Sequence, residues 1–514
     1  MAKNILDKIK NELKKDIYLT TLIFLGVFIH ILYFIILTKI ARFHYVHFYD
    51  YYTRYAVITE SIKSLDFTTV YRLFVGAMTP KIILYRSVPF MLLFGSSQLT
   101  YRFSALTFNY GLILILYHYL KKLFSRKDSF LITLFILSGS FSIELFASAY
   151  SDFSLLITTG IYYITIILFI KNPRKQLFSL TAVSTLMYLV KITSSLIVPI
   201  TSLAFAIAIL ISTKIMKSRK IDSIKYLITA NVLAILLYFL LGYFGNLKAI
   251  IYHTFTVNIP PQVLQESLKS NLIDPWIKTI YYILNINISY TKDIYLKFKE
   301  IYLIVLLYIS IAYFLIKKRE KKWLFIIFIS ELILIIISNY VVEVENVILA
   351  FFVPYHIIMY LFLKEAIFSK IRLKKITKYS VYILLLAIYI SNLSYFLSQG
   401  HINPYYSKNS RESDFINYEI FTNYPVESTF FYDFGINDII EYETRTFYDF
   451  GQGNYTKYSH IDKRFGYKLT NKIEKSNYIL CYSHLCNKYE NHTLLDEFIL
   501  DKTTKYKVYK TILN

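Results

Sequence analysis

From Ile17 to Ile40 the chain reads IYLTTLIFLGVFIHILYFIILTKI, an apolar run interrupted by one histidine and one lysine. A helix needs about 20 apolar residues to cross the hydrocarbon core of a membrane, so this run predicts a transmembrane helix. The sequence as a whole predicts an α-helical polytopic membrane protein with about eleven transmembrane helices. The expected spans are residues 17–40, 103–120, 129–147, 153–170, 177–190, 193–213, 226–244, 301–316, 323–338, 347–363 and 379–397.

The composition of the 514 residues agrees with this fold class. Hydrophobic residues make up 55% of the chain and charged residues only 18%, against about 25% charged in a typical soluble domain. The net charge of +23 could suggest a nucleic-acid partner, but the excess lies in short loops between the apolar runs. Because that placement follows the positive-inside rule, we expect a membrane and no nucleic acid.

Basic clusters occupy alternate loops and predict the topology. The expected cytoplasmic side receives Lys14 and Lys15, Lys121 to Lys127, Lys171 to Lys175, Lys214 to Lys225, Lys317 to Lys322 and Lys364 to Lys378. The short loops 148–152 and 339–346 on the other side contain no Lys or Arg. We therefore expect a multi-pass plasma-membrane protein with a cytoplasmic N-terminus and an extracytoplasmic C-terminal segment.

Two domains are expected. Residues 1–397 form the transmembrane domain, with large outer loops at 41–102 and 245–300. Residues 398–514 form a small extracytoplasmic α/β domain, with strand-like runs at 428–432, 478–482 and 505–509 and a helix-like run at 437–442. This domain holds both cysteines, Cys481 and Cys486, whose spacing allows either a disulfide or two free thiols.

The first outer loop contains an expected surface helix from Arg54 to Leu65. Tyr55, Ile58, Ile62 and Leu65 recur there at helical spacing, which is typical of an amphipathic helix at a membrane surface.

Ionisable side chains at membrane level are costly, so each is a candidate functional residue. The expected outer face gathers a set of them: Asp50, Arg54, Lys81, Arg86, Asp152 and Lys191. The two carboxylates could share a proton-accepting role, or one could orient an acceptor while the other takes its proton. The basic side chains would suit a lipid-linked phosphate.

Structural roles are the alternatives for the same residues. Asp152 could cap the helix that follows it, and Asp50 could be a solvated loop acid. Lys81, Arg86 and Arg102 could be interfacial anchors whose charged ends reach water. The sequence has no metal-binding motif and no glycine-rich phosphate loop, so a soluble nucleotide donor finds no support.

The order of these elements resembles that of polytopic C-type (GT-C) glycosyltransferases, and specifically the protein O-mannosyltransferase and aminoarabinose-lipid A transferase group. In that group an Asp-Glu-x-x-Tyr-Ala element follows the first span, and a Lys-Pro-Pro-Leu-like element, a Phe-Gly and an Arg that opens the next span come later. The matching stretches are Asp50 to Ala56, Lys81 to Pro89, Phe94-Gly95, Tyr101 to Leu106, Ser148 to Asp152 and Leu189 to Lys191. Two departures stand out: Tyr51 replaces the acid beside Asp50, and the double proline after Lys81 is absent.

The resemblance implies an enzyme that transfers a hexosyl or pentosyl group from a polyprenyl-phosphate carrier to a lipid, glycan or protein acceptor on the outer face. Asp50 would be the general base, and Lys81, Arg86 and Lys191 would hold the leaving phosphate. Asp152 would position the acceptor or share a divalent ion, and the loop 245–300 would contact the carrier through Lys248 and His253. A multi-pass transporter or lipid flippase is the alternative, but we find neither an internal repeat nor many Gly/Pro-broken spans.

Overall fold

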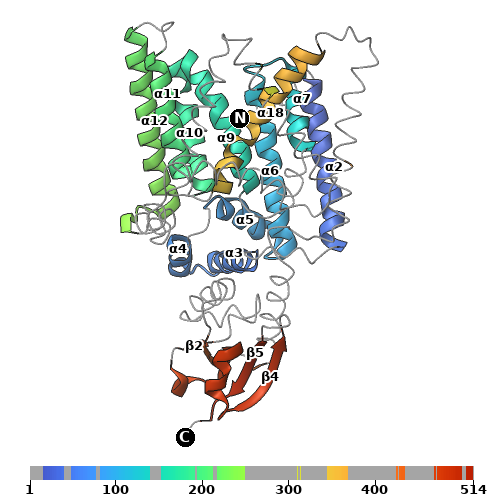
Figure 1. The fold of residues 1–514 in the computed structure, drawn as a ribbon, viewed down its shortest axis with the longest axis vertical. Coiled ribbons are helices and arrows are strands. Elements are labelled where there is room, and N and C mark those ends of the chain that lie inside the picture. The colour runs from blue at the N-terminus through green and yellow to red at the C-terminus, as the bar shows by residue number, and fades with distance from the viewer. Residues whose placement is uncertain are drawn as a thin grey trace. The chain divides into compact units, whose positions relative to one another are not determined.

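The computed structural model describes fifteen segments of the chain (Figure 1). These are residues 16–39, 48–76, 81–138, 152–191, 194–211, 217–248, 309–310, 313, 344–368, 390, 424–425, 428–433, 468–470, 472–499 and 505–512. The chain divides into two compact units. The first comprises Met1–Lys39, Tyr71–Pro89 and Arg102–Gly400, and the second comprises Ile40–Val70, Phe90–Tyr101 and His401–Asn514.

The first unit is built from long helices. They are α2 (Ile17–Lys39), α6 (Gln98–Leu120), α7 (Arg126–Ser138), α9 (Asp152–Lys171), α10 (Pro173–Val190), α11 (Ser194–Ile211), α12 (Lys217–Tyr243) and α18 (Val344–Phe362), which continues as a π-helical turn η1 (Leu363–Phe368). In Figure 1, α9 to α12 run side by side, and α10 packs against both α9 and α12. The shorter helices α4 (Phe67–Gly76) and α5 (Lys81–Phe94) cross the boundary between the units.

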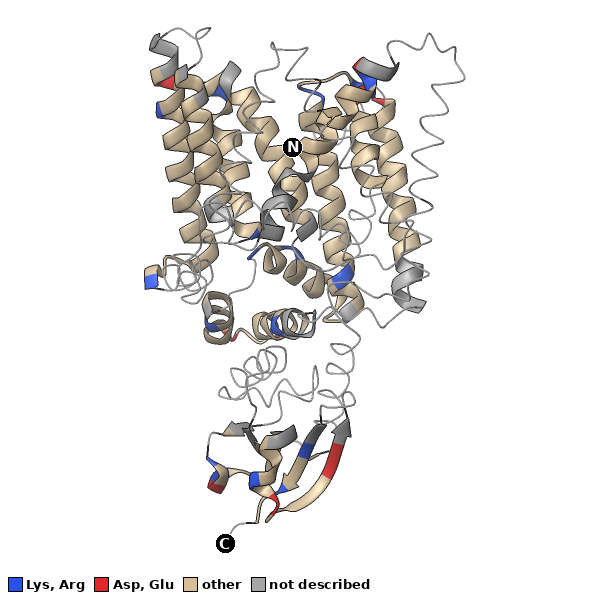
Figure 2. Cartoon of the chain, in the orientation of Figure 1, with Lys and Arg blue, Asp and Glu red and all other residues tan. Residues whose placement is uncertain are grey.

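Exposed apolar side chains on these helices point to lipid as their solvent. The exposed large aliphatic residues of α12 are Ile221, Ile228, Val232, Leu233, Ile235, Leu236, Leu237, Leu240 and Leu241. Figure 2 shows that the charged residues of the long helices lie near helix ends. Among the described residues, two helices are long and apolar enough to cross a membrane, Leu99–Leu120 and Ile221–Tyr243, and shorter apolar helices lie at Ile17–Tyr33, Ser154–Phe169 and Ile197–Ile207.

The described helices overlap the expected spans, but several begin earlier than expected: α10 begins four residues before 177 and α12 begins nine residues before 226. α2, α9 and α11 begin and end within two residues of the expected limits, whereas α6 begins at Gln98, five residues before the expected start at 103. Gln98, Thr100 and Arg102 are polar and do not count toward an apolar run, yet they continue the helix because Ser97 caps it: Ser97 Oγ accepts from the Thr100 N–H at 3.1 Å. The expected spans 301–316, 323–338 and 379–397 lie outside the described segments except for residues 309–310, 313 and 390.

A buried acid joins the start of α2 to the end of α6. Asp16 caps α2 by accepting from the Leu19 N–H at 3.2 Å, and it also accepts from Tyr117 Oη at 2.9 Å and Lys121 Nζ at 2.7 Å. Burial raises the pKa of this carboxyl, but the bonds from Lys121, Tyr117 and Leu19 outweigh it and hold the pKa below its usual value.

A second buried acid joins α7 to α18 in the same way. Asp128, in the first turn of α7, accepts from Tyr360 Oη at 2.7 Å and from Lys364 Nζ at 2.7 Å. The two contacts therefore place Lys121 at the start of α2 and Lys364 at the start of α7, and the charge pattern assigns both lysines to a single side.

The second unit contains α3 (Phe48–Lys63) and a five-stranded mixed sheet in the C-terminal segment. The strands are β1 (Thr429–Asp433), β2 (Lys468–Thr470), β3 (Tyr478–Tyr482), β4 (Thr493–Ile499) and β5 (Lys505–Lys510), in the order β2-β1-β3-β5-β4. β1 is parallel to β2 and β3, and β5 is antiparallel to β3 and β4. Three strands lie on the three strand-like runs, whereas the helix-like run 437–442 lies outside the described residues.

The two cysteines form a disulfide. Cys481 on β3 is joined to Cys486 in the 3-10 turn η5 (Ser483–Tyr489), and both are fully buried. They pack with Ile479, Tyr489 and Tyr509 in one cluster, so the bond forms part of the core of the sheet domain.

Candidate functional site

The helix α3 carries two of the expected site residues. Asp50 and Arg54 are four residues apart, so their Cβ atoms lie on the same face of the helix. Arg54 is half-buried. The side chain of Asp50 lies outside the described residues, and its role as a base stays a prediction.

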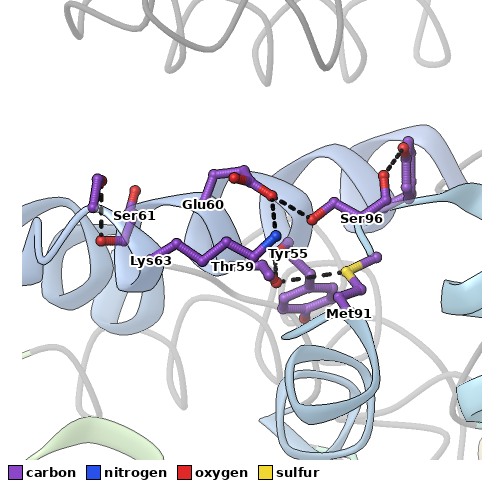
Figure 3. Close-up of polar contacts among 9 residues, drawn as sticks. Tyr55, Thr59, Glu60, Ser61, Lys63, Met91 and Ser96 are labelled. Atoms are coloured by element: carbon purple, nitrogen blue, oxygen red, sulfur yellow. Dashed lines mark hydrogen bonds and ion pairs between the residues drawn. The ribbon is translucent and has the colours of Figure 1, made fainter. Parts of the chain in front are cut away.

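Contacts from α3 to the end of α5 and the start of α6 fix the helix that carries Asp50 (Figure 3). Thr59 Oγ1 lies 3.6 Å from Met91 Sδ, and Glu60 Oε1 accepts from Ser96 Oγ at 2.8 Å. Tyr52 Oη donates to the Ser96 carbonyl at 3.0 Å. These contacts start from Tyr52 in the first half of α3 and from Thr59 and Glu60 in its second half, so they restrain both the position of the helix and its rotation about its own axis.

Gly95 makes the turn between α5 and α6 possible. Its φ is +89°, a backbone conformation that L side chains rarely adopt. The turn places Ser96 within hydrogen-bonding distance of Tyr52 and Glu60 on α3. This geometry explains why a glycine stands in the Phe-Gly element at this point in the sequence.

The expected amphipathic pattern of this segment is only partly correct. Tyr55 and Ile58 are buried, but Leu65 is 73% exposed, lies beyond the end of α3 and has a positive φ. The apolar side therefore ends with Ile62, because the chain leaves the helix at Lys63 and turns into α4, which Asp66 caps through the Thr69 N–H at 3.1 Å.

Lys81 opens α5 and lies in an enclosed aromatic environment. Its side chain is 4% exposed, and Nζ donates to the Phe74 carbonyl at 2.6 Å. The same nitrogen lies 5.1 Å from the Phe74 ring centroid and 4.7 Å from that of Tyr243 on α12. These contacts hold a cation inside the protein through dipoles and ring faces.

Two arginines near Lys81 in the sequence are also buried. Arg86 on α5 is 4% exposed and Arg102 on α6 is 7% exposed. A hydrogen bond of 3.0 Å between Ser87 Oγ and Ser104 Oγ ties the two helices together beside them. An interfacial anchor would keep its charged end accessible, so the burial of Lys81, Arg86 and Arg102 favours a role inside the protein over the anchor alternative.

The remaining expected site residues lie at helix ends or outside the described residues. Lys191 ends α10, where its extended backbone (φ −155°, ψ 139°) donates to the Met187 carbonyl, and its side chain is half-buried. Asp152 is the first residue of α9, but its side chain is not among those described, so capping and catalysis remain alternatives. His253 lies outside the described residues.

The described side chains include no group of three or more His, Cys, Asp or Glu residues that could hold a metal ion. The expected sharing of a divalent ion by Asp152 stays a prediction, as does a proton-accepting role shared by Asp50 and Asp152.

Sequence reasoning missed the two buried acids, Asp16 and Asp128. A signal for them was present: the helices α6 and α18 both end in Tyr-x-x-Leu-Lys, at Tyr117 to Lys121 and Tyr360 to Lys364. In each case the tyrosine and the lysine both donate a hydrogen bond to the same aspartate.

The fold is similar to two solved structures of ArnT, an aminoarabinose-lipid A transferase of the GT-C class, from Cupriavidus metallidurans. The match to ArnT bound to undecaprenyl phosphate has a TM-score of 0.56 and 8% identity, and it covers 96% of this chain and 98% of that one. The match to apo ArnT has a TM-score of 0.55 and 10% identity, with the same coverage. No family model matches the sequence, and no curated protein does. The resemblance to GT-C enzymes is thus confirmed for the fold, that of a polytopic helical membrane protein.

Proposed function

We propose that this protein is a membrane glycosyltransferase that moves a sugar from a polyprenyl-phosphate carrier to an acceptor on the outer face of the plasma membrane. The observation that carries the proposal is the likeness of fold to ArnT over 96% of the chain, in a structure that holds undecaprenyl phosphate. The transferred group is a hexosyl or pentosyl unit, and the acceptor is a lipid, a glycan or a protein hydroxyl.

Buried positive charge supports the binding of a lipid phosphate. Lys81 and Arg86 are both 4% exposed, so their charges act in a medium of low dielectric constant, where they attract an anion strongly. Lys191 adds a third cation at the end of α10. As the bond between the anomeric carbon and the phosphate oxygen breaks, negative charge grows on that oxygen, and these groups stabilise it.

The acceptor is activated by a base. In the proposed step the acceptor oxygen attacks the anomeric carbon, its proton passes to the Asp50 carboxylate, and the polyprenyl phosphate leaves with the bonding electron pair. General-base assistance of this kind contributes about 10²–10⁴-fold in rate. Arg54, on the same face of α3, orients the Asp50 carboxylate or the acceptor, while Asp152 positions the acceptor or shares a divalent ion. His253 contacts the carrier from the outer loop.

Two observations support the proposed orientation. Lys121 pairs with Asp16 at the start of α2, and Lys364 pairs with Asp128 at the start of α7, as is expected of basic residues that share a cytoplasmic face. The C-terminal sheet domain contains a disulfide, and disulfides persist in oxidising compartments outside the cytoplasm.

Sugar transfer by membranes containing the wild type or Asp50→Asn tests the proposal. Labelled undecaprenyl-phosphate hexoses and pentoses are supplied, and transfer is measured at equal protein abundance. We expect Asp50→Asn to lose about 10²–10⁴-fold of the rate, whereas Asp222→Asn, at an exposed acid on α12, retains it. Undiminished transfer by Asp50→Asn would remove Asp50 as the base, and no transfer by the wild type with any donor would favour transport instead.

A further inference from the structure

One face of α10 carries a line of hydroxyl groups that ends at Lys191. Thr181, Ser184 and Tyr188 follow one another at intervals of three and four residues, and Lys191 comes three residues later. This spacing puts the three hydroxyl residues on one side of the helix, and Lys191 is the residue with extended backbone that follows its end. The three hydroxyl residues, called the hydroxyl stripe below, are 6%, 0% and 4% exposed.

The hydroxyls of the stripe stand out from others in the same unit. Within the described part of the chain, none of the three hydroxyl oxygens has a hydrogen-bond partner. Thr158 and Thr165 on α9, by contrast, donate to carbonyls one turn back at 2.6 and 2.7 Å. A buried hydroxyl without a partner is unfavourable, so three on one face leave hydrogen-bonding capacity that a polar ligand would satisfy.

The stripe is connected to the buried cation on α5. The Tyr188 ring lies 5.5 Å from that of Tyr238 on α12, and Tyr238 Oη donates to Tyr243 Oη at 3.3 Å. The Tyr243 ring is in turn the one beneath Lys81 Nζ. A run of aromatic side chains from two helices, α10 and α12, therefore leads from the stripe to Lys81, and Lys191 directly follows the end of α10.

We propose that the hydroxyl stripe binds the sugar of the carrier-linked donor, while Lys81 and Lys191 hold the phosphate; this inference rests on the proposed function. A sugar offers several hydroxyls that donate and accept, together with an apolar C–H face that packs on a tyrosine ring. From Thr181 to Tyr188 the stripe is about 10 Å long, at 1.5 Å per residue, which exceeds the reach of a phosphate alone. Neutral hydroxyls recognise a polyol, whereas the charge of a phosphate is met by the two lysines.

Binding of two kinds of carrier by the purified full-length protein in detergent tests the inference. The probes are undecaprenyl phosphate alone and a panel of undecaprenyl-phosphate-linked hexoses and pentoses. The wild type should bind one or more of the sugar-bearing carriers more tightly than the bare carrier. In Thr181→Val/Ser184→Ala/Tyr188→Phe this preference should fall about tenfold to a hundredfold, while the Kd for the bare carrier stays the same. Lys81→Met should weaken the binding of both kinds.

A stability measurement separates ligand binding from a structural role. Because the stripe hydroxyls lack described partners in the ligand-free protein, the triple variant should have a Tm equal to or above that of the wild type. The control variant Thr158→Val/Thr165→Val removes hydroxyls that are hydrogen-bonded on α9, so its Tm should fall and its sugar preference should stay.

Three outcomes would overturn the inference alone: a triple variant that keeps the sugar preference, a triple variant whose ligand-free Tm falls, or a wild type that binds the bare carrier but prefers none of the sugars. A wild type that binds neither kind of carrier would overturn the proposed function and this inference together. The bare-carrier measurement therefore distinguishes the two failures.

Discussion

The helices α9 and α18 pack closely at Gly160. A Cβ added to Gly160 would lie 2.6 Å from Val353 Cβ and 3.0 Å from its Cγ2, and distances under 3.0 Å essentially never occur for real Cβ atoms. Val353 is fully buried and β-branched, so it cannot rotate away. The change Gly160→Ala must therefore push the two helices apart.

The magnitude follows from two opposing effects. Overpacking of this kind costs about 1–3 kcal/mol, and a clash with Cβ rather than with a flexible tip places the cost in the upper half of that range. Replacing a helical glycine by alanine gains about 0.8–1 kcal/mol from helix propensity. Gly160→Ala should thus lower the free energy of unfolding by about 1–2 kcal/mol.

Gly111 supplies a matched control, because nothing lies within 4 Å of a Cβ built there on α6. Gly111→Ala should keep only the propensity gain, so the two variants should differ by about 2–3 kcal/mol in detergent-solubilised unfolding experiments. Val353→Ala alone should destabilise by opening a cavity, and combined with Gly160→Ala it should relieve the clash with the two Val353 methyl groups but not the clash with Cβ, which alanine retains. If Gly160→Ala is as stable as Gly111→Ala, the close packing of α9 on α18 is refuted.

Other consequences can be measured on the same protein. The pKa of Asp16 is held below its ordinary value of 3.8, so the stabilising effect of its carboxylate is complete above that pH and is lost as the pH falls through the folded-state pKa. The difference in Tm between the wild type and Asp16→Asn should therefore narrow on acidification below about pH 4. A constant difference would contradict the hydrogen bonds of Asp16 with Tyr117 and Lys121. Tyr360→Phe removes a bond to the Asp128 carboxylate and should lower the free energy of unfolding by about 1.5–3 kcal/mol; an unchanged value would show that the α7–α18 contact does not form. Gly95→Ala forces an alanine to φ +89° and should lower sugar transfer by shifting α3, with activity at the wild-type level as the contrary result. Alkylation of the unfolded chain without reductant should leave Cys481 and Cys486 unlabelled, and labelling of both would disprove the disulfide.

Local sequence was sufficient for the elements whose limits depend on a local property. The ends of α2, α9 and α11 follow from the length of an apolar run, because the membrane thickness fixes that length. The strands β1, β3 and β5 follow likewise from runs of β-branched and aromatic residues bounded by polar ones. The start of α6 was missed, because a polar turn continues a helix whenever a cap supplies the missing acceptor.

The candidate site was predicted only in part. The sequence named Lys81 and Arg86 but left open whether their charged ends reach water. Burial of Lys81 depends on Tyr243, which is far along the chain, so no local pattern could reveal it. The hydroxyl stripe has a readable spacing on α10, but buried hydroxyls without partners become evident only when the neighbouring helices are in place.

The sequence by itself determined that this is a polytopic helical membrane protein, and it predicts which loops share a side and that the candidate acids and bases collect on one face. These features depend on the length of apolar runs and on the placement of charge, both of which act residue by residue along the chain. The tertiary structure alone decided which groups meet: Asp16 with Lys121 across 105 residues, Asp128 with Lys364 across 236, and Lys81 with the ring of Tyr243. Such pairs are selected by the packing of whole helices, because a buried charge is stable only where distant parts of the chain together supply its partners.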